Sequence, residues 1–311
     1  MRAALLLALL ACSKSPALFE HGLDHVGIAV TDLAAARKTF HDGLGFGAVV
    51  PGKLPNGIEN INYYFEDSTY LETLTAYDPQ KARQVADFTA KGEGAIFAAL
   101  SINSPDAAKA FFDKRGVKTG APIPGSIKTE RESTSWKTMF FEGSAKSLEL
   151  FFFIAYDQPQ RNEMLSKLHA AIQSGKVYKH PNGALGIKAA WLAVPDLEQA
   201  VKQFEAAGFP AGATFAEPRL GGTGRLIEAG QGKIALIAPA ASDSPVAQLL
   251  ARRGGPALLG LSIEVSLLGV AQKFAARTTG HKMPAAAGAL GQSIWIEPAV
   301  THGAWLELFQ R

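Results

Sequence analysis

One histidine and two glutamates interrupt stretches that are otherwise apolar. His25 lies in LDHVGIAV, Glu72 in TYLETLTAY and Glu149 in SLELFFFIAYD. Each stretch has the β-branched or aromatic content of a strand, and alternation along a strand places His25 on one face with Gly27 and Ala29. A carboxylate that is buried in such surroundings needs a hydrogen-bonding partner or a cation. The three side chains are therefore the first candidates for chemistry.

Structural roles for the same residues stay open. A single histidine on a strand is more often part of the packing than a ligand. The two glutamates can instead pair across a sheet with basic side chains nearby in the sequence, namely Arg131, Lys137 or Lys146. The choice depends on which elements position these side chains and on whether they share a face.

The elements around His25 and Glu72 follow the order strand, helix, strand, strand, strand over residues 23–78. Asp32 is placed to cap a helix whose apolar residues recur at helical spacing, and Gly43 and Gly45 end it. Three further strands follow, separated by Gly, Pro, Asn and Asp. This segment reads as one βαβββ unit.

The same order recurs three more times along the chain. The second unit begins at AIFAALSIN, the third at LGIKAAWLAV and the fourth at LLGLSIEV, whose second strand is poorly marked. Units one and three match closely, with GIAVTDLAAARKTF against WLAVPDLEQAVKQF. Asp32 then aligns with Asp196, and Phe40 aligns with Phe204. The chain is therefore predicted to contain four tandem modules.

Four tandem βαβββ units resemble the vicinal oxygen chelate superfamily, and three phrases narrow the resemblance to its glyoxalase-like branch. These are LDHVGIAVTDL, GIENINYYFEDSTYLETL and HPNGALGI, in that order. The resemblance implies an α+β fold of two half-open glyoxalase/dioxygenase-type barrels with two modules each. We expect the first barrel over residues 12–157, a helical linker over 158–182 and the second barrel over 183–311.

The resemblance also implies a metal in the cup of a barrel, with ligands on the first and fourth strands of each module. His25, Glu72 and Glu149 lie at such positions, and Glu72 and Glu149 would then be catalytic. The fourth position falls on Phe97 or Ile96, neither of which binds metal. An imidazole and two carboxylates with open water positions suit Zn, Mn, Fe or Ni. The missing ligand leaves open a cup that binds its ligand without metal.

The second barrel retains less of this pattern. Ala189 is aligned with His25, Ile234 with Glu72, and Leu259 is the fourth unit's counterpart, so only Glu307 remains. One carboxylate does not hold a catalytic metal. We expect this barrel to be structural, or to form a second cup without metal.

Four further residues are candidates for substrate binding. Asn62 and Tyr64 share one face of a strand, where they would line the cup, or they represent ordinary strand polarity. Arg131 and Trp136 resemble an Arg-then-Trp pattern of the glyoxalase-like branch. Arg131 would neutralise a substrate carboxylate with two hydrogen bonds, or it is a surface arginine without a role.

The N-terminus predicts export. Arg2 precedes an apolar run over residues 3–11, which is too short to span a bilayer and fits a secretory signal peptide over residues 1–11. The run ends at Leu10-Ala11-Cys12, which resembles a bacterial lipobox with lipidation on Cys12, the only cysteine of the chain. Ser13 favours the outer membrane, facing the periplasm. The alternative is a plain cleaved signal peptide.

Composition excludes several classes of function. The formal charge is only +3 and no Lys/Arg run reaches five, so nucleic-acid binding is not expected. No glycine-rich stretch joins a strand to a helix in phosphate-binding form. The expected function is an exported metal-dependent lyase, isomerase or dioxygenase acting on a small oxygenated molecule. The alternatives are a metal-free protein that binds or sequesters a small molecule in the cell envelope, and an envelope scaffold.

Overall fold

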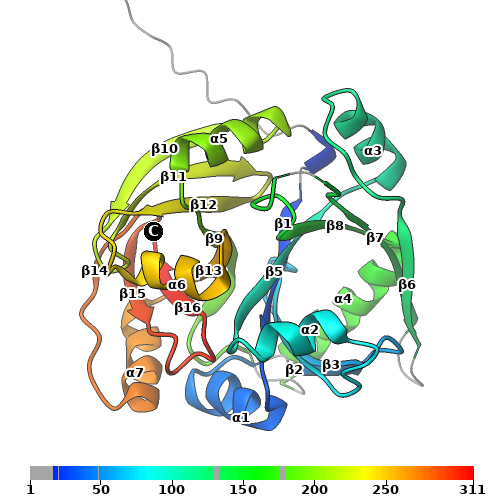
Figure 1. Ribbon diagram of the computed structural model, residues 1–311. Coiled ribbons are helices and arrows are strands. Elements are labelled where there is room, and N and C mark those ends of the chain that lie inside the picture. The colour runs from blue at the N-terminus through cyan, green and yellow to red at the C-terminus, as the bar shows by residue number, and fades with distance from the viewer. Residues whose placement is uncertain (1–16, 20, 48, 129–132, 144, 176–178) are drawn as a thin grey trace, which may run out of the picture.

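The computed structural model describes residues 17–19, 21–47, 49–128, 133–143, 145–175 and 179–311. Two curled sheets of eight strands each lie side by side, with helices on both faces of each sheet (Figure 1). The predicted fold class, two glyoxalase/dioxygenase-type half-barrels with two βαβββ modules each, is confirmed. Cys12 and Arg131 lie outside the described residues.

The first sheet has the strand order β2-β3-β4-β1-β5-β8-β7-β6. β1 pairs in parallel with β4 and in antiparallel with β5, so the two modules meet at the β1–β5 pair. The bounds are β1 (Gly22–Ala29), β2 (Val49–Lys53), β3 (Ile58–Tyr64), β4 (Tyr70–Ala76), β5 (Gly94–Ser101), β6 (Ile123–Lys128), β7 (Ser133–Phe140) and β8 (Phe151–Tyr156).

The second sheet repeats this topology in the order β10-β11-β12-β9-β13-β16-β15-β14. Its poorly marked strand is only two residues long. The bounds are β9 (Ala184–Ala193), β10 (Ala211–Glu217), β11 (Gly222–Ala229), β12 (Gly232–Pro239), β13 (Ala257–Val265), β14 (Ala286–Ala287), β15 (Gln292–Ile296) and β16 (Trp305–Gln310).

The helices fall into two groups. Three of those inside the modules begin at a side-chain cap: Asp32, which accepts hydrogen bonds from Ala34 N and Ala35 N, Ser104 and Asp196. The group inside the modules is α1 (Leu33–Arg37), continued by the π-helix η2 (Lys38–Gly43), α3 (Pro105–Asp113), α5 (Leu197–Ala206) and α7 (Leu268–Thr279). The other group follows the fourth strand of a module and is α2 (Arg83–Thr89), α4 (Gln158–Gln173) and α6 (Pro245–Arg253). A short 3-10 helix, η1 (Ala17–Phe19), precedes β1.

The second group of helices fills the concave faces of the sheets. Figure 1 shows α2 and α4 within the curve of the first sheet and α6 within the second. α4 directs Met164, Leu165 and Leu168 onto Tyr64 and Tyr70 of the first sheet. The stretch predicted as a helical linker thus carries a helix that packs back into the first barrel and covers one part of its cup.

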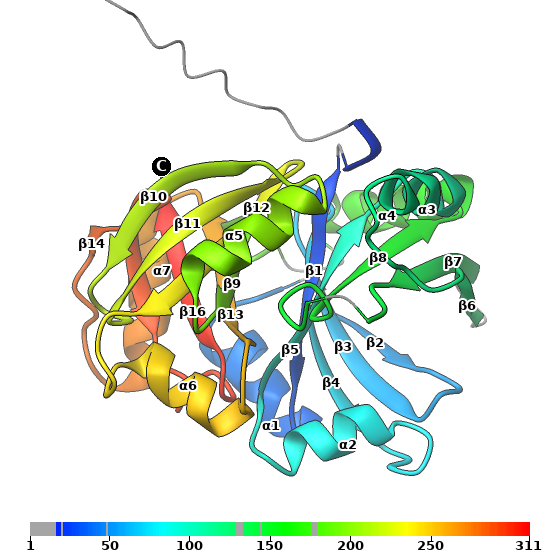
Figure 2. The same cartoon turned by 45° about the horizontal axis from the view of Figure 1, so that its top comes forward.

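The main core lies between the two barrels. Val26 and Ile28 of β1 belong to the same apolar cluster as Leu261 and Ile263 of β13, and all four side chains are fully buried. The convex faces of the two sheets therefore pack back to back (Figure 2). Burying one such side chain contributes about 1.5–3 kcal/mol, which holds the barrels together.

Backbone also meets backbone between the barrels. Gly22, at the start of β1, has a φ of +58°, and a Cβ there would lie 1.7 Å from the carbonyl oxygen of Ala229. Only glycine tolerates both the left-handed conformation and this approach. The turn between β11 and β12 is thereby held against the start of the first barrel.

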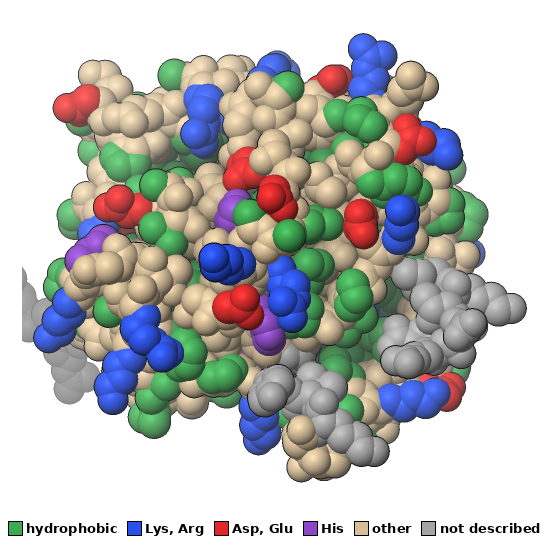
Figure 3. Space-filling view, turned by 90° about the horizontal axis from the view of Figure 1, so that it is seen from below, with side chains coloured by type: hydrophobic (Ala, Val, Ile, Leu, Met, Phe, Trp, Pro, Cys, Tyr) green, Lys and Arg blue, Asp and Glu red, His purple; other side chains and the backbone are tan. Residues whose placement is uncertain are grey.

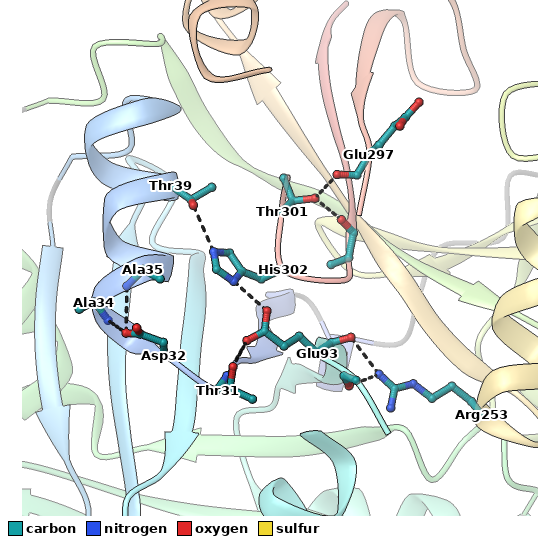
Figure 4. Close-up of polar contacts among 12 residues, drawn as sticks. Thr31, Asp32, Ala34, Ala35, Thr39, Glu93, Arg253, Glu297, Thr301 and His302 are labelled. Carbon is teal, nitrogen blue, oxygen red and sulfur yellow. Dashed lines mark hydrogen bonds and ion pairs between the residues drawn. The ribbon is translucent and has the colours of Figure 1, made fainter. Parts of the chain in front are cut away.

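A polar network joins the barrels at the opposite end of the interface (Figure 4). Glu93 Oε1 accepts hydrogen bonds from Thr31 N and Oγ1, both at 2.6 Å, and Oε2 lies 2.9 Å from His302 Nδ1. His302 Nε2 lies 3.1 Å from Thr39 Oγ1. Arg253 donates to the carbonyl oxygens of Gly92 and Glu93. Since these groups are all engaged with one another, we interpret the network as a lock between the barrels.

Glu93→Gln should lower the free energy of unfolding by about 1–2 kcal/mol at neutral pH, because a charged acceptor of three hydrogen bonds is lost. Burial alone would raise the pKa of Glu93, but the bonds from Thr31 and His302 hold it below its ordinary value. The stabilisation is therefore present above the ordinary glutamate pKa and fades as the pH falls through the folded value. Chemical denaturation across the acidic range checks this. Glu66→Gln, at an exposed site, is the control; equal losses in both variants would contradict the lock.

Candidate functional site

His25 and Glu72 meet in the cup of the first barrel. They project from the adjacent parallel strands β1 and β4, and His25 Nε2 lies 3.7 Å from Glu72 Oε2. The two residues are 3% and 7% exposed. The Nδ1 atom of His25 lies 2.7 Å from Asp24 Oδ1. An ionised Asp24 accepts from Nδ1–H, which leaves Nε2 directed at Glu72.

Asp24 is held from a second side by the end of β8 and by α4. Its carboxylate accepts hydrogen bonds from Tyr156 Oη and Arg161 Nη2, each at 3.0 Å. Burial raises the pKa of Asp24, but Arg161 and His25 outweigh this and hold it below its ordinary value. The result is a buried chain of contacts that runs from Arg161 through Asp24 to His25.

The carboxyl group of Glu72 lies beside the amide side chains of Asn60 and Asn62. Burial raises its pKa above the ordinary value, against the attraction of His25 and a 2.6 Å hydrogen bond from Asn60 Nδ2. Asn62 lies directly opposite Glu72 on β3. The Oδ1 atoms of Asn60 and Asn62 are buried and accept no hydrogen bond within the described residues. This end of the cup therefore presents two free acceptors beside a carboxyl group.

Aromatic side chains form the rest of the cup. The ring of Tyr70 stacks on His25 with centroids 4.3 Å apart, and Phe97 and Phe152 approach His25 edge-on at 5.8 and 5.6 Å. Phe97 lies over Gly27, where a Cβ would come within 2.5 Å of its ring. On the far side of Phe152, Phe140 stacks on it and remains 39% exposed.

The register of the sheet shows which residues occupy the four positions expected for metal ligands. Gly27 pairs with both Glu72 and Phe97, and in the second module Ala99 pairs with both His25 and Phe152. The pseudo-twofold between modules thus relates His25 to Phe97 and Glu72 to Phe152. The sequence places either Phe97 or Ile96 at the position without a ligand, and the register shows that it is Phe97.

The placement of Glu149 on the fourth strand of the second module is wrong. β8 begins only at Phe151, and Glu149 lies exposed in the preceding turn, away from His25 and Glu72. No group of three or more His, Cys, Asp or Glu side chains that could hold a metal occurs in the described part of the chain. His25 and Glu72 are the only donors at the four expected ligand positions, since Phe97 and Phe152 occupy the other two. This set does not fit a metal centre with four protein ligands.

Three of the four predicted substrate-binding residues, Asn62, Tyr64 and Trp136, lie around this cup, and the fourth, Arg131, lies outside the described residues. Asn62 faces Glu72, and Tyr64 is buried between Tyr70 and α4. Trp136 joins the aromatic cluster of Phe97 and Phe152. Its indole covers Gly125 on the neighbouring strand.

Three residues of the site were missed from the sequence. Strand alternation places Asp24 on the face opposite His25, but a register shift between Leu23 and His25 allows the two side chains to meet. An aspartate inside an apolar strand was the available signal. Arg161 and Phe152 carried no local signal, because their roles arise from the docking of α4 and from the true start of β8.

The second barrel has different residues at these positions from those aligned by sequence. The register places Ala235, not Ile234, at the position of Glu72, and Gly260, not Leu259, at that of Phe97. Ala189 occupies the position of His25, and Glu307 occupies the position of Phe152. Trp191 Nε1 donates to Ser262 Oγ, which in turn donates to Glu307 Oε2. This cup is filled by indole rings around the buried carboxyl group of Glu307, and the buried Glu217, paired with Arg219 at 2.7 Å, lies close enough to raise the pKa of Glu307.

Glu307→Gln should leave the protein at least as stable as the native chain at neutral pH. Glu307 is fully buried, and burial raises its pKa above the ordinary 4.5. The folded state therefore keeps a proton that the unfolded state releases, and stability falls as the pH rises above that ordinary value. An amide removes this dependence, so the advantage of the variant should grow with pH in denaturation curves. A loss of more than about 1 kcal/mol at neutral pH would show that the ionised form is needed.

On the face that Figure 3 displays, basic and acidic side chains are interspersed. Among the described residues, no helix combines the length and apolar character that a membrane span requires.

Comparisons with known proteins agree with this architecture. A family model described as "Glyoxalase-like domain" matches residues 23–193, more than half of the chain. No curated protein sequence matches. Among solved structures, a hypothetical protein from Staphylococcus aureus has a TM-score of 0.62 at 13% identity, covering 93% of this chain and 98% of its own.

Two neighbours with assigned names show the same fold. A variant of 4-hydroxymandelate synthase from Streptomyces coelicolor has a TM-score of 0.59 at 16% identity and covers 93% of this chain and 92% of its own. The Mn(II)-bound glyoxalase from Novosphingobium aromaticivorans has a TM-score of 0.56 at 14% identity, with 93% and 82% covered. With the family match and the two-barrel fold, this chain belongs to the glyoxalase-like domain family of the vicinal oxygen chelate superfamily.

Proposed function

We propose that the first barrel is a metal-free cup that binds a small molecule with an aromatic or apolar body. The observation that carries this proposal is the presence of Phe97 and Phe152 at two of the four ligand positions, with their rings against His25. Their side chains form an apolar wall at two of the positions expected for metal ligands. Binding sites of this kind are mostly apolar with a few polar groups that orient the ligand.

The polar end of the cup defines what the ligand carries. Among the described residues, Asn60 Oδ1 and Asn62 Oδ1 are buried acceptors without a donor. An unmade hydrogen bond of this kind costs about 1–3 kcal/mol. A hydroxyl or amino group on the ligand would supply that donor. The ligand is therefore an aromatic or apolar molecule with at least one hydrogen-bond donor.

Ligand-observed NMR on chelator-treated protein tests the proposal. A panel of phenols and anilines should bind more tightly than the matching hydrocarbons, and Asn62→Ala should reduce that preference by about five- to tenfold. Asn56→Ala, at an exposed turn, is the matched control and should change nothing. If none of the panel binds, or if Asn62→Ala leaves the preference intact, the proposal fails.

A metal-dependent reaction on a small oxygenated molecule, with Zn, Mn, Fe or Ni, is the second candidate. One observation favours it: His25 directs Nε2 at Glu72 while Asp24 accepts from its other nitrogen, and metal-bound histidines usually have such a carboxylate partner. Metal analysis of protein purified without chelators tests it. A stoichiometric divalent metal that Glu72→Ala abolishes would favour this candidate over the metal-free cup.

We also propose that the protein is exported and anchored by lipid on Cys12 in the bacterial envelope, at the outer membrane and facing the periplasm. The lipobox-like Leu10-Ala11-Cys12 after a short apolar run supports this. Its ligand would be a periplasmic small molecule, and its contact with the membrane would be the anchor alone. Cys12→Ser should move the protein from the membrane fraction to the soluble fraction. An unmodified N-terminus in the native protein would contradict the proposal.

A further inference from the structure

A separate cavity of about 220 Å³ lies where α4 and the start of β1 meet the second barrel. Leu23 and Asp24 of the first barrel, Leu165 of α4, and Ile187 and Gln231 of the second barrel take part in its wall. It is smaller than the pockets of about 300–1,000 Å³ that hold drug-sized ligands. A cavity at the junction of two barrels is a common location for a binding site.

Polar side chains without protein partners line this cavity. Ser101 is buried, and its hydroxyl forms no hydrogen bond with any described residue. The amide groups of Gln158, Asn162 and Gln231 line the cavity from exposed positions at its rim. Arg161 is only 7% exposed, and its Nη1 is buried without an acceptor although Nη2 binds Asp24. The wall thus offers both donors and acceptors.

The charges of the wall cancel in pairs. Arg161 neutralises Asp24 at 3.0 Å, and Lys188 neutralises Asp67 at 2.6 Å. A charged ligand would lose its hydration without meeting an unpaired countercharge in these pairs. The cavity therefore favours an uncharged ligand.

We propose that this cavity binds a small neutral polyol of about the size of a monosaccharide. A hydroxyl group both donates and accepts, so several neighbouring hydroxyls can satisfy the amides, Ser101 and Arg161 Nη1 together. Leu23, Leu165 and Ile187 provide apolar surface for the C–H faces of such a ligand. The site is distinct from the aromatic cup, although Asp24 belongs to both.

Titration calorimetry of the purified full chain with xylose, glucose and myo-inositol tests the proposal. At least one of these polyols should bind. Asn162→Ala and Gln231→Ala, at exposed sites on α4 and on the second barrel, should each weaken it about fivefold through the loss of one hydrogen bond. Gln199→Ala, an exposed amide on α5 outside the cavity, is the matched control and should leave the affinity unchanged.

Three results would overturn the proposal: no polyol binds, small carboxylates or amines bind more tightly than polyols, or the control variant loses as much affinity as the cavity variants. Asn62→Ala separates this site from the aromatic cup. It should leave polyol binding intact, whereas a loss of polyol binding in this variant would place the polyol in the cup instead.

Discussion

Phe97→His combined with Phe152→Glu should create a divalent metal site that the native cup does not offer. The two positions are related by the pseudo-twofold to His25 and Glu72, so the variant would present two imidazoles and two carboxylates to one point. Such donors suit zinc-like ions at about 2.0–2.2 Å. Metal at a hundredfold excess over its dissociation constant would then stabilise the variant by about 2.7 kcal/mol. Thermal unfolding with and without metal measures the gain.

The control for this experiment is Phe97→Leu combined with Phe152→Leu. It removes the aromatic rings without adding donors, so it should lose packing energy but gain nothing from metal. If the native protein gains as much from metal as the redesigned one, then His25 and Glu72 already bind the metal together with other groups of the cup. The metal-free interpretation of the cup would then be wrong.

Arg161→Leu should be among the most destabilising substitutions of a single polar residue, at about 3–5 kcal/mol, because it leaves the buried Asp24 without its cation. The effect should depend on pH. The pKa of Asp24 is lowered in the folded protein, so its contribution is present above the ordinary value of 3.8 and is lost as the pH falls through the folded value. Denaturant unfolding at neutral and acidic pH should show the gap between native and variant closing in acid.

The double variant with Asp24→Asn and Arg161→Leu tests whether the loss comes from the unpaired charge. Removing both charges should restore a large part of the stability that Arg161→Leu alone loses. If the double variant is as unstable as the sum of both single variants, the loss comes from packing of the Arg161 stem against Tyr156, which it covers at 3.7 Å.

The sequence by itself predicts the module order, and the resemblance of that order to the vicinal oxygen chelate superfamily implies the two-barrel fold. Strand alternation and helical spacing are local properties, and caps such as Asp32 and Asp196 mark where each helix begins. His25 and Glu72 converge because they lie on the first and fourth strands of a module, which are neighbours in all four modules. The sequence also shows that the first strand of the second module lacks a ligand, because both Phe97 and Ile96, the two candidates for that position, are apolar.

The rest of the site depended on the tertiary structure. The sequence predicts Glu149 on a strand because most of SLELFFF is apolar. Periodicity does not locate the first paired residue of a strand, however, and β8 begins two residues later. Asp24 reaches His25 only because the β1–β5 ladder shifts its register. Arg161 reaches Asp24 only because α4 folds back into the barrel, across 137 residues of chain. Contacts of this kind arise from the packing of distant segments, which no local pattern of residues encodes.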